Sequence, residues 1–150
     1  SAELERIGDY AKNVAKRTLT LIQAAAVGTA SNTIVRMGAI AGSMISNVID
    51  AYLNADIVKA KEVRARDTDV DQLHTSLFRE LLTYMMEDPR NITACTHLLF
   101  IAKNIERIGD HVTNIAESVH FLVVGENFGE DRPKSDFSSS TIVSLEDSAP

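Results

Sequence analysis

The chain has 150 residues, of which 45% are hydrophobic and only 5% aromatic, with three prolines and no tryptophan. This composition favours helices packed through aliphatic side chains and argues against a β-sandwich. The formal net charge of −6 argues against nucleic-acid binding through a basic face as the main activity. The single cysteine, Cys95, excludes an intramolecular disulfide and suits a reducing compartment. No apolar run approaches the roughly 20 residues of a membrane span, so we expect no direct membrane insertion.

Apolar residues alternate three and four positions apart in three stretches of the chain, a pattern typical of long helices packed at shallow angles. These seams comprise Leu4, Ile7, Ala11, Val14, Thr18 and Leu21; Ile34, Met37, Ala41, Met44, Val48 and Ala51; and Leu98, Ile101, Ile105, Ile108, Val112, Ile115, Val119 and Leu122. A looser stripe lies between the last two seams. We therefore expect an all-α chain with helices near 2–26, 31–53, 56–87 and 91–124.

The breaks between these helices carry residues that commonly cap helix ends. They are Gly28 as a C-cap, Ser31 or Asn32 as an N-cap, a tight turn at 54–56 with a polar N-cap, Asp88 followed by Pro89, and Gly125 after the last helix. Beyond that point, residues 126–150 are acidic and rich in serine, which predicts a disordered tail. A partner-binding segment around Phe137 to Leu145 is the alternative interpretation of this tail.

Two segments 101 positions apart are near-copies: LERIGDYAKNVAKRTLTL at 4–21 and IERIGDHVTNIAESVHFL at 105–122. Without a gap, Glu5, Arg6, Ile7, Gly8, Asp9, Asn13, Ala15 and Leu21 recur as Glu106, Arg107, Ile108, Gly109, Asp110, Asn114, Ala116 and Leu122. Such repetition indicates that one supersecondary unit is used twice. Only three residues precede the first copy, so we expect the first unit to be incomplete.

Two pairs of acids predict a metal site. Glu106 and Asp110 share one face of the last helix, and Asp67 and Asp71 share one face of the helix before it, because each pair is four residues apart. Asp67 and Asp71 lie as far before the 88–89 turn as Asp110 and Glu106 lie after it. The two pairs should therefore lie at the same height on adjacent antiparallel helices.

Four carboxylates at one height form a hard-oxygen ligand set that suits Mg, Mn, Ca or iron, with enough charge for more than one cation. Asn114, one turn after Asp110, can add a ligand oxygen or a hydrogen bond, and His111 is a weaker candidate ligand. The alternative is a solvated acidic face with surface ion pairs to arginine. Glu117 and His120 match half of a ferritin-like di-iron motif, and Cys95 is interpreted as a small buried side chain.

Two stretches carry motifs of a known family: AKNIERIGDHVTNIAESV followed by FLVVGE, and RDTDVDQLHTSLFRELLTYMMEDP before it. In these stretches the chain resembles the PhoU family of bacterial phosphate-signalling proteins, over about residues 1–125. The resemblance implies a fold of two similar three-helix bundles. Residues 1–28 would be the last helix of a truncated first bundle, residues 29–125 a complete second bundle, and residues 126–150 a tail outside the family. The expected architecture is a long antiparallel three-helix bundle plus one additional helix.

The resemblance also implies a multinuclear metal cluster bound on the bundle surface through E/D-x-x-x-D motifs. Iron is the first expectation, and manganese, magnesium or zinc are the others. Carried over residue by residue, the ligands are Asp67, Asp71, Glu106 and Asp110, with Asn114 nearby. The pair formed by Glu5 and Asp9 matches the equivalent motif of the first bundle, whose partner acids are not in this chain. We therefore expect that second site to be a half-site.

Functionally, the resemblance implies a cytoplasmic adaptor and not an enzyme. The adaptor would link the ATPase subunit of the Pst phosphate transporter to a PhoR-type sensor histidine kinase and restrain phosphate uptake and starvation signalling. We also expect a homo-oligomer, because helix 2–26 lacks most of its bundle neighbours. Three alternatives stay open: a carboxylate-bridged metalloenzyme of the bundle type, a purely structural helical module, and the accessory protein of a different phosphate permease. The outward heptad positions of Glu106 and Asp110 argue against the enzyme.

Overall fold

A computed structural model describes residues 2–24 and 26–128 of the chain. Over these residues the secondary structure is helical, and no strand is present. The elements are α1 (Ala2–Leu21), α2 (Ala30–Asn54), α3 (Ile57–Glu87), the short 3₁₀-helix η1 (Pro89–Asn91) and α4 (Ile92–Val124). The prediction of an all-α chain is confirmed, and three of the four helices begin and end within two residues of the predicted positions.

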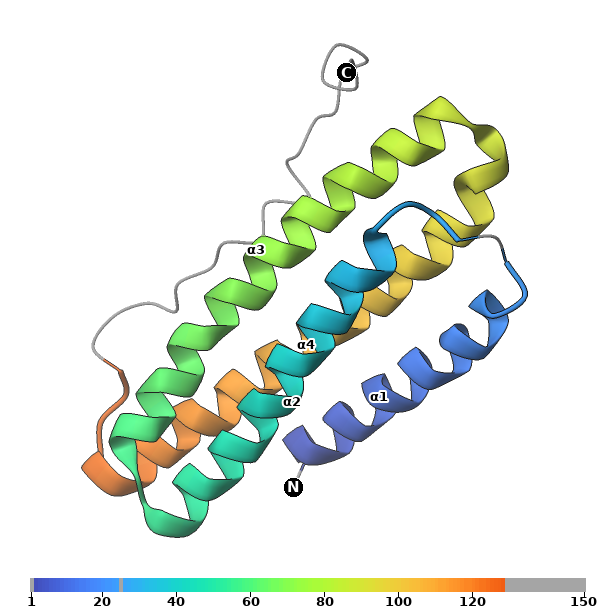
Figure 1. The fold of residues 1–150 in the computed structure, drawn as a ribbon. Helices are drawn as coiled ribbons and strands as arrows, with labels where there is room; N and C mark the ends of the chain where they lie inside the picture. Colours follow the sequence, from blue (N-terminus) through green and yellow to red (C-terminus); the bar gives the residue numbers. More distant parts are fainter. Residues whose placement is uncertain (1, 25, 129–150) are drawn as a thin grey trace.

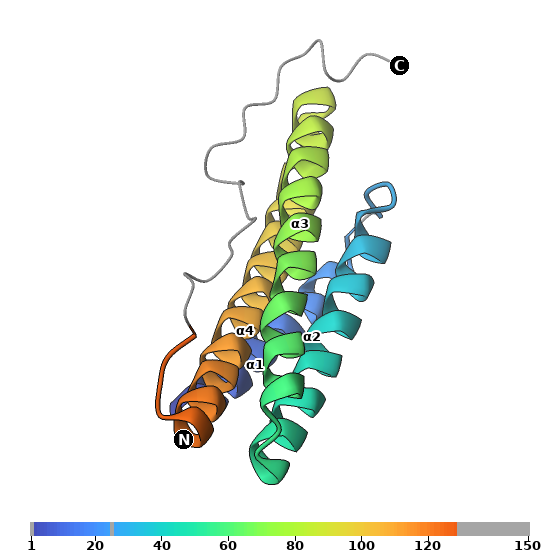
Figure 2. The same cartoon turned by 90° about the vertical axis from the view of Figure 1, so that its left-hand side faces the viewer.

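Three helices, α2, α3 and α4, form an antiparallel bundle, and α1 packs along the outside of α4 (Figures 1 and 2). At about 1.5 Å per residue, α3 and α4 are each close to 50 Å long. The expected architecture of a three-helix bundle plus one additional helix is therefore present. The core lies between α2, α3 and α4, with one side of α1 closing it along α4.

The predicted apolar seams of α2 and α4 are buried over most of their length. The seam of α1 differs from the prediction. Ile7 is buried and Val14 and Leu21 pack against the core, whereas Leu4 and Ala11 are exposed. Half of the α1 seam thus faces the core along α4, and the other half is exposed.

Helices α1 and α4 run antiparallel, so that the start of α1 lies beside the last third of α4. Glu3 is bonded to His111, and Arg17 is bonded to His97. The rings of Tyr10 and His111 stack with centroids 5.5 Å apart. Tyr10 and His111 are equivalent positions of the internal repeat, and equivalent residues of two antiparallel copies meet only near a twofold axis. The two repeat helices are therefore related by an approximate local twofold axis.

The first helix ends at Leu21 and not near residue 26, which corrects the prediction. The register between α1 and α4 places Leu21 level with the first turn of α4, so a longer α1 would extend past its partner with nothing to pack against. The chain turns instead, and Val27 returns to the core. Gly28 adopts a left-handed φ of 49°, and a Cβ there would overlap the Tyr84 hydroxyl group. Glycine is therefore required in this loop, although it does not directly cap α1.

The other helix ends follow the sequence signals with one exception. The carboxylate of Asp56 accepts a hydrogen bond from the Lys59 amide at 2.9 Å and caps α3. Asp88 accepts one from the Arg90 amide at 3.0 Å, and Gly125 ends α4 with a φ of 78°. The exception is α2, which begins at Ala30 after Thr29 and makes no side-chain cap. Ser31 and Asn32 therefore lie inside the helix, and the prediction of either as its N-cap was wrong.

Among the described residues, α2 is the one helix long and apolar enough to cross a membrane, judged by length and composition alone. The sequence pattern led us to expect no such segment. A single helix of this kind is weak evidence of a span, since the core helix of a soluble bundle passes the same test. The side of α2 that carries Met37, Met44 and Val48 is fully buried against α3 and α4.

Candidate metal centre

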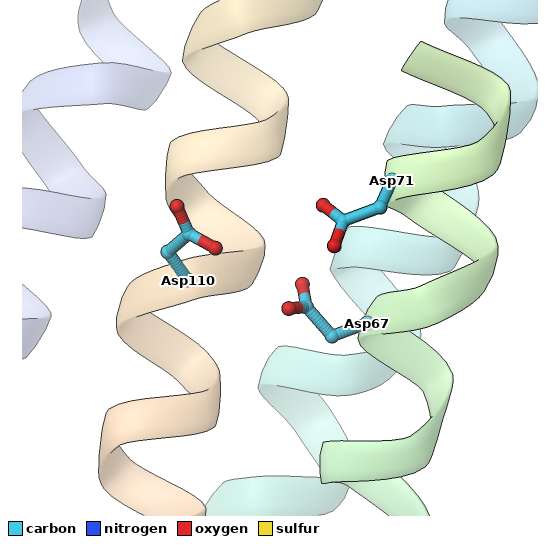
Figure 3. A group of neighbouring side chains, drawn as sticks. All are labelled: Asp67, Asp71 and Asp110. Carbon is cyan, nitrogen blue, oxygen red and sulfur yellow. The ribbon is translucent and has the colours of Figure 1, made fainter. Parts of the chain in front are cut away.

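Three carboxylates converge between α3 and α4. Asp67 and Asp71 come from successive turns of α3, and Asp110 faces them from α4 (Figure 3). One oxygen of each side chain lies within 4.8 Å of one oxygen of each of the others. Asp67 and Asp71 are fully buried and Asp110 is half-buried. The structure therefore brings together three of the four acids that the sequence pattern placed at one height.

The close approach of the two helices depends on Gly109, the residue before Asp110. A Cβ at Gly109 would lie 2.6 Å from the Asp67 Oδ1 atom and 3.9 Å from the Val70 Cγ1 atom. Because real Cβ atoms essentially never come so close to an oxygen, any larger residue would push the Asp67 carboxylate away. The glycine of the repeated motif thus makes the space in which the Asp67 carboxylate lies against the α4 backbone.

Glu106 lies along the same groove but outside this group of three. Its side chain is 2% exposed, and the Lys103 ammonium group lies 3.0 Å from its Oε2 atom. The Glu106 side chain is buried between helices, whereas its heptad position predicted an outward orientation. The position of Glu106 therefore gives no argument against an enzyme, which corrects that part of the sequence interpretation.

One polar residue of this region was missed in the sequence. His74 is buried, and its spacing from Asp67 and Asp71 places all three side chains on one face of α3. Sequence analysis did not single out His74, although Asp71 and His74 are only one turn apart. That spacing was the available signal. Thr113 is buried on the α4 side and donates a hydrogen bond to the Gly109 carbonyl at 2.9 Å.

Asn114 and His111 face α1. The Asn114 amide donates a hydrogen bond to the Glu3 carboxylate at 3.4 Å, and His111 bonds to the same oxygen. The hydrogen bond from His111 is the main reason why the pKa of Glu3 lies below its usual value. Partial burial raises this pKa, and the hydrogen bond from Asn114 lowers it further. A role for Asn114 or His111 as a metal ligand stays a prediction.

Glu5 and Asp9 lie on the exposed face of α1, in a shallow pocket that Arg6 and Tyr10 also line. Gly8, the equivalent of Gly109, has no atom within 4 Å of the position its Cβ would take. Among the described residues, no group of three candidate ligands forms around this pair. The half-site expected from the sequence therefore shows two acids and an open side.

The Glu-x-x-His motif of α4 makes other contacts. Glu117 pairs with Arg64 at 3.5 Å, and the His120 ring bonds to the Glu126 carbonyl at 3.0 Å. The Phe128 ring stacks on His120, with centroids 4.1 Å apart, and lies under the Arg64 guanidinium group. These residues hold the first residues after α4 against α3. The predicted tail beyond residue 128 lies outside the described residues.

Cys95 is buried and has a free thiol, which confirms the prediction of a small buried side chain. Loss of hydration by burial raises the pKa of its thiol. A buried, protonated thiol is a poor metal ligand and nucleophile, so Cys95 packs as a small apolar side chain.

The donor set fits a hard cation. Hard cations bind oxygens at about 2.0–2.6 Å, so two ligand atoms on opposite sides of one ion lie about 4–5 Å apart. The mutual separations of up to 4.8 Å between the three carboxylates match this range. All-oxygen ligands select Mg, Mn, Ca or iron over metals that prefer thiolates. Asp67, Asp71 and Asp110 would hold the ion, and its charge would offset the three carboxylates.

Comparisons with known proteins agree with this fold. The PhoU domain family matches residues 34–119. A phosphate-specific transport system accessory protein PhoU homolog of Caulobacter vibrioides is 52% identical over 136 residues, covering 91% of this chain and 59% of that protein. A homolog of the same name from Rhizobium meliloti is 48% identical, covering 98% of this chain and 62% of that protein.

The crystal structure of PhoU from Pseudomonas aeruginosa superposes with a TM-score of 0.80 at 38% identity, covering 83% of this chain and 60% of that one. The chain thus spans about three fifths of the length of the relatives it matches. The family match covers more than half of the chain, including α3, most of α4 and the three converging carboxylates. On these grounds, the chain belongs to the PhoU family.

Proposed function

We propose that this chain is the metal-binding part of a PhoU-type regulator of phosphate uptake. The convergence of Asp67, Asp71 and Asp110 beside Gly109 carries the proposal. The relatives are named accessory proteins of the phosphate-specific transport system, and these names support a regulatory role more than an enzymatic one. Iron is the first candidate, and manganese, magnesium or zinc are the others.

A cation at this centre would join the two longest helices of the bundle. Its charge would offset the three carboxylates, and its bonds to Asp67, Asp71 and Asp110 would hold α3 and α4 in one register. A ligand that binds the folded state and not the unfolded state stabilises the protein by about 2.7 kcal/mol when its free concentration is 100 times its dissociation constant. Metal loading would therefore set the rigidity of the surface that the bundle presents to its partners.

The first experiment measures bound metal. The chelator-treated protein is loaded separately with Fe²⁺, Mn²⁺, Mg²⁺ and Zn²⁺, and the ion content is determined by elemental analysis beside thermal unfolding. An Asp71→Asn/Asp110→Asn double variant tests the centre. Asp9→Asn is the matched control, because Asp9 is the repeat equivalent of Asp110 but lies on the open face of α1. We expect stoichiometric metal and a raised Tm in the wild type and the control, and neither in the double variant.

Metal retained by the double variant would contradict the centre. No metal in any of the proteins would leave the acids as a structural cluster and favour a purely structural helical module. Redox cycling of the bound ion with turnover of a substrate would favour the alternative of a carboxylate-bridged metalloenzyme.

We further propose that the chain acts as an adaptor between the transporter's ATPase subunit and a PhoR-type sensor kinase. An apolar groove of about 490 Å³ at one end of the bundle supports a protein contact. Leu4, Ile49, Tyr52 and Leu122 line it from α1, α2 and α4, and all four side chains are exposed. Binding to each purified partner should weaken in Tyr52→Asp and persist in Val35→Asp, an exposed α2 position outside the groove. Equal binding by both variants would exclude this groove.

Self-association is the expected oligomeric behaviour. Leu19 and Ile22 are exposed on or just after α1, and α1 packs against α4 alone among the described helices. Sedimentation velocity over a hundredfold range of concentration should show a larger species as the concentration rises. A monomer at every concentration would contradict the expectation.

A further inference from the structure

A second polar pocket lies between α1 and α4, outside the acidic centre. It has a volume of about 450 Å³ and is formed by the second half of α1 and the first half of α4. Its basic lining residues are Lys16 and Arg17 on α1 and His97 on α4. No aspartate or glutamate is among the described residues that line it. In a chain with a net charge of −6, this gathering of basic side chains needs an explanation.

Arg17 is held in place by two contacts across the helix interface. Its Nη1 atom lies 3.2 Å from the His97 Nδ1 atom, and its Cζ atom lies 3.9 Å from the centroid of the Phe100 ring. A guanidinium group only donates hydrogen bonds, so Nδ1 accepts and the neutral imidazole carries its proton on Nε2. A stacked arginine with N–H groups left over, beside a second N–H donor, is a typical recognition arrangement for an oxyanion.

Neither cation of α1 is neutralised nearby. Lys16 and Arg17 form no ion pair with another of the described residues. The remaining polar lining is neutral and supplies amide and hydroxyl groups from Asn13, Thr20 and Asn104. The pocket thus combines fixed positive charge with several hydrogen-bond donors on two opposing walls, which suits a tetrahedral anion with many acceptor oxygens.

The internal repeat shows that these basic residues are not needed to pack the helix. The equivalent surface of α4 also lines a pocket, at the other end of the α1–α4 pair. There Asn13 is kept as Asn114, but Lys16, Arg17 and Thr20 are replaced by Glu117, Ser118 and Phe121. One copy of the motif therefore presents two cations where the other presents one acid and a neutral hydroxyl group.

We propose that the pocket between α1 and α4 binds a phosphate group, either free or carried by a small organic molecule. Arg17 and Lys16 supply the charge, and His97 supplies a donor from the facing helix. The proposal goes beyond the metal-dependent function and does not depend on it, because none of these residues belongs to the acidic centre.

The test titrates the chelator-treated protein with inorganic phosphate and follows the His97 imidazole resonances by NMR, at constant ionic strength. A parallel titration uses a nucleoside monophosphate. The Asp71→Asn/Asp110→Asn background excludes phosphate bound through residual metal. Arg17→Gln and Lys16→Gln test the pocket, and Lys12→Gln is the control, because Lys12 is exposed on α1 but does not line the pocket. Helical circular dichroism checks that each variant is folded.

We expect saturable shifts of His97 that survive in the acidic-centre variant and in Lys12→Gln. Affinity should fall about tenfold or more in Arg17→Gln, since hydrogen bonds to charged groups are the stronger kind. Tighter binding of the nucleotide would identify a phosphate ester as the ligand, and equal binding would identify free phosphate. Shifts reproduced by chloride, or affinity unchanged in a folded Arg17→Gln protein, would overturn the proposal.

Discussion

The two copies of the Glu-Arg-Ile-Gly-Asp motif have the same sequence but opposite surroundings. In α4, Glu106 and Gly109 are buried and Asp110 is half-buried, with α3 pressed against them. In α1, the equivalent residues Glu5, Gly8 and Asp9 are exposed, and the space beside Gly8 is open. The motif alone thus supplies two acids and room for a neighbour.

The difference shows where the carboxylate centre originates. Two acids at i and i+4 repel each other on an isolated helix, and only a second helix with its own acids turns them into a ligand set. Asp67 and Asp71 on α3 do this for α4. Substituting a residue in one copy and its equivalent in the other therefore tests what the surroundings of each copy contribute.

The largest difference is expected for packing. Ile105 and Leu4 are equivalent positions, but Ile105 is 5% exposed whereas Leu4 is 46% exposed. Ile105→Ala should lower the free energy of unfolding by about 2–5 kcal/mol, because it leaves a cavity between helices. Leu4→Ala should lower it by less than about 1 kcal/mol, since a half-exposed side chain loses little burial.

Urea unfolding followed by circular dichroism measures both changes. The midpoint should shift for Ile105→Ala with little change in the slope of unfolding free energy against urea. Similar midpoints for the two variants would mean that α1 packs as tightly as α4, against the burial seen here.

A smaller and more specific effect is expected at the motif glycines. Gly8→Ala should raise the free energy of unfolding by up to about 1 kcal/mol, because alanine is the better helix former and meets no neighbour. Gly109→Ala gains the same propensity but forces the Asp67 carboxylate out of its position. The metal affinity of Gly109→Ala should fall about tenfold or more, which is the usual cost of removing a group that orients a metal ligand.

Metal titration monitored by thermal unfolding separates the two variants. Gly8→Ala should bind metal as the wild type does, with a higher Tm. Undiminished affinity in Gly109→Ala would show that Asp67 is not required at the centre.

Much of the bundle was predictable because helical periodicity and end signals act locally. The ends of α3 and α4 follow from Asp56, Asp88 and Gly125, each of which acts within one turn of its own position. The end of α1 was not predictable in this way. It depends on where α4 begins, which is a tertiary relation between distant residues.

The candidate site was predictable to the same degree. An antiparallel hairpin fixes the relative height of Asp67, Asp71 and Asp110, so counting from the turn places them together. Counting residues from the turn does not show which side chains are buried. It therefore did not show that Glu106 lies inside the groove with Lys103, or that His74 shares the buried face of α3. Which side of a helix is covered depends on the packing angle of its neighbours, and the amino-acid pattern leaves that angle open.

The smallest effect concerns the pH dependence of the contact between the two copies. Glu3 binds His111 and Asn114 through a hydrogen-bonded carboxylate, which lowers its pKa below the usual 4.5. A lowered pKa means that the charged form is favoured in the folded state. The stabilisation is therefore complete above about pH 4.5 and is lost as the pH falls through the lowered pKa. The repeat equivalent of Glu3 is Asn104, which does not titrate.

The difference in unfolding free energy between the wild type and Glu3→Gln isolates this contribution from the other acids. At pH 7 the difference should be below about 1 kcal/mol, because the Glu3 side chain is 36% exposed and solvent screens the pair. By pH 3 it should be smaller, since a protonated Glu3 resembles glutamine. Asn104→Asp introduces a carboxylate at the equivalent position of α4, in the pocket that Lys16 and Arg17 also line. The two cations favour its charged form, so any stability that this carboxylate adds should also be lost as the pH falls. A difference that grows as the pH falls would contradict the assigned direction of the Glu3 pKa and with it the role of this contact in holding α1 on α4.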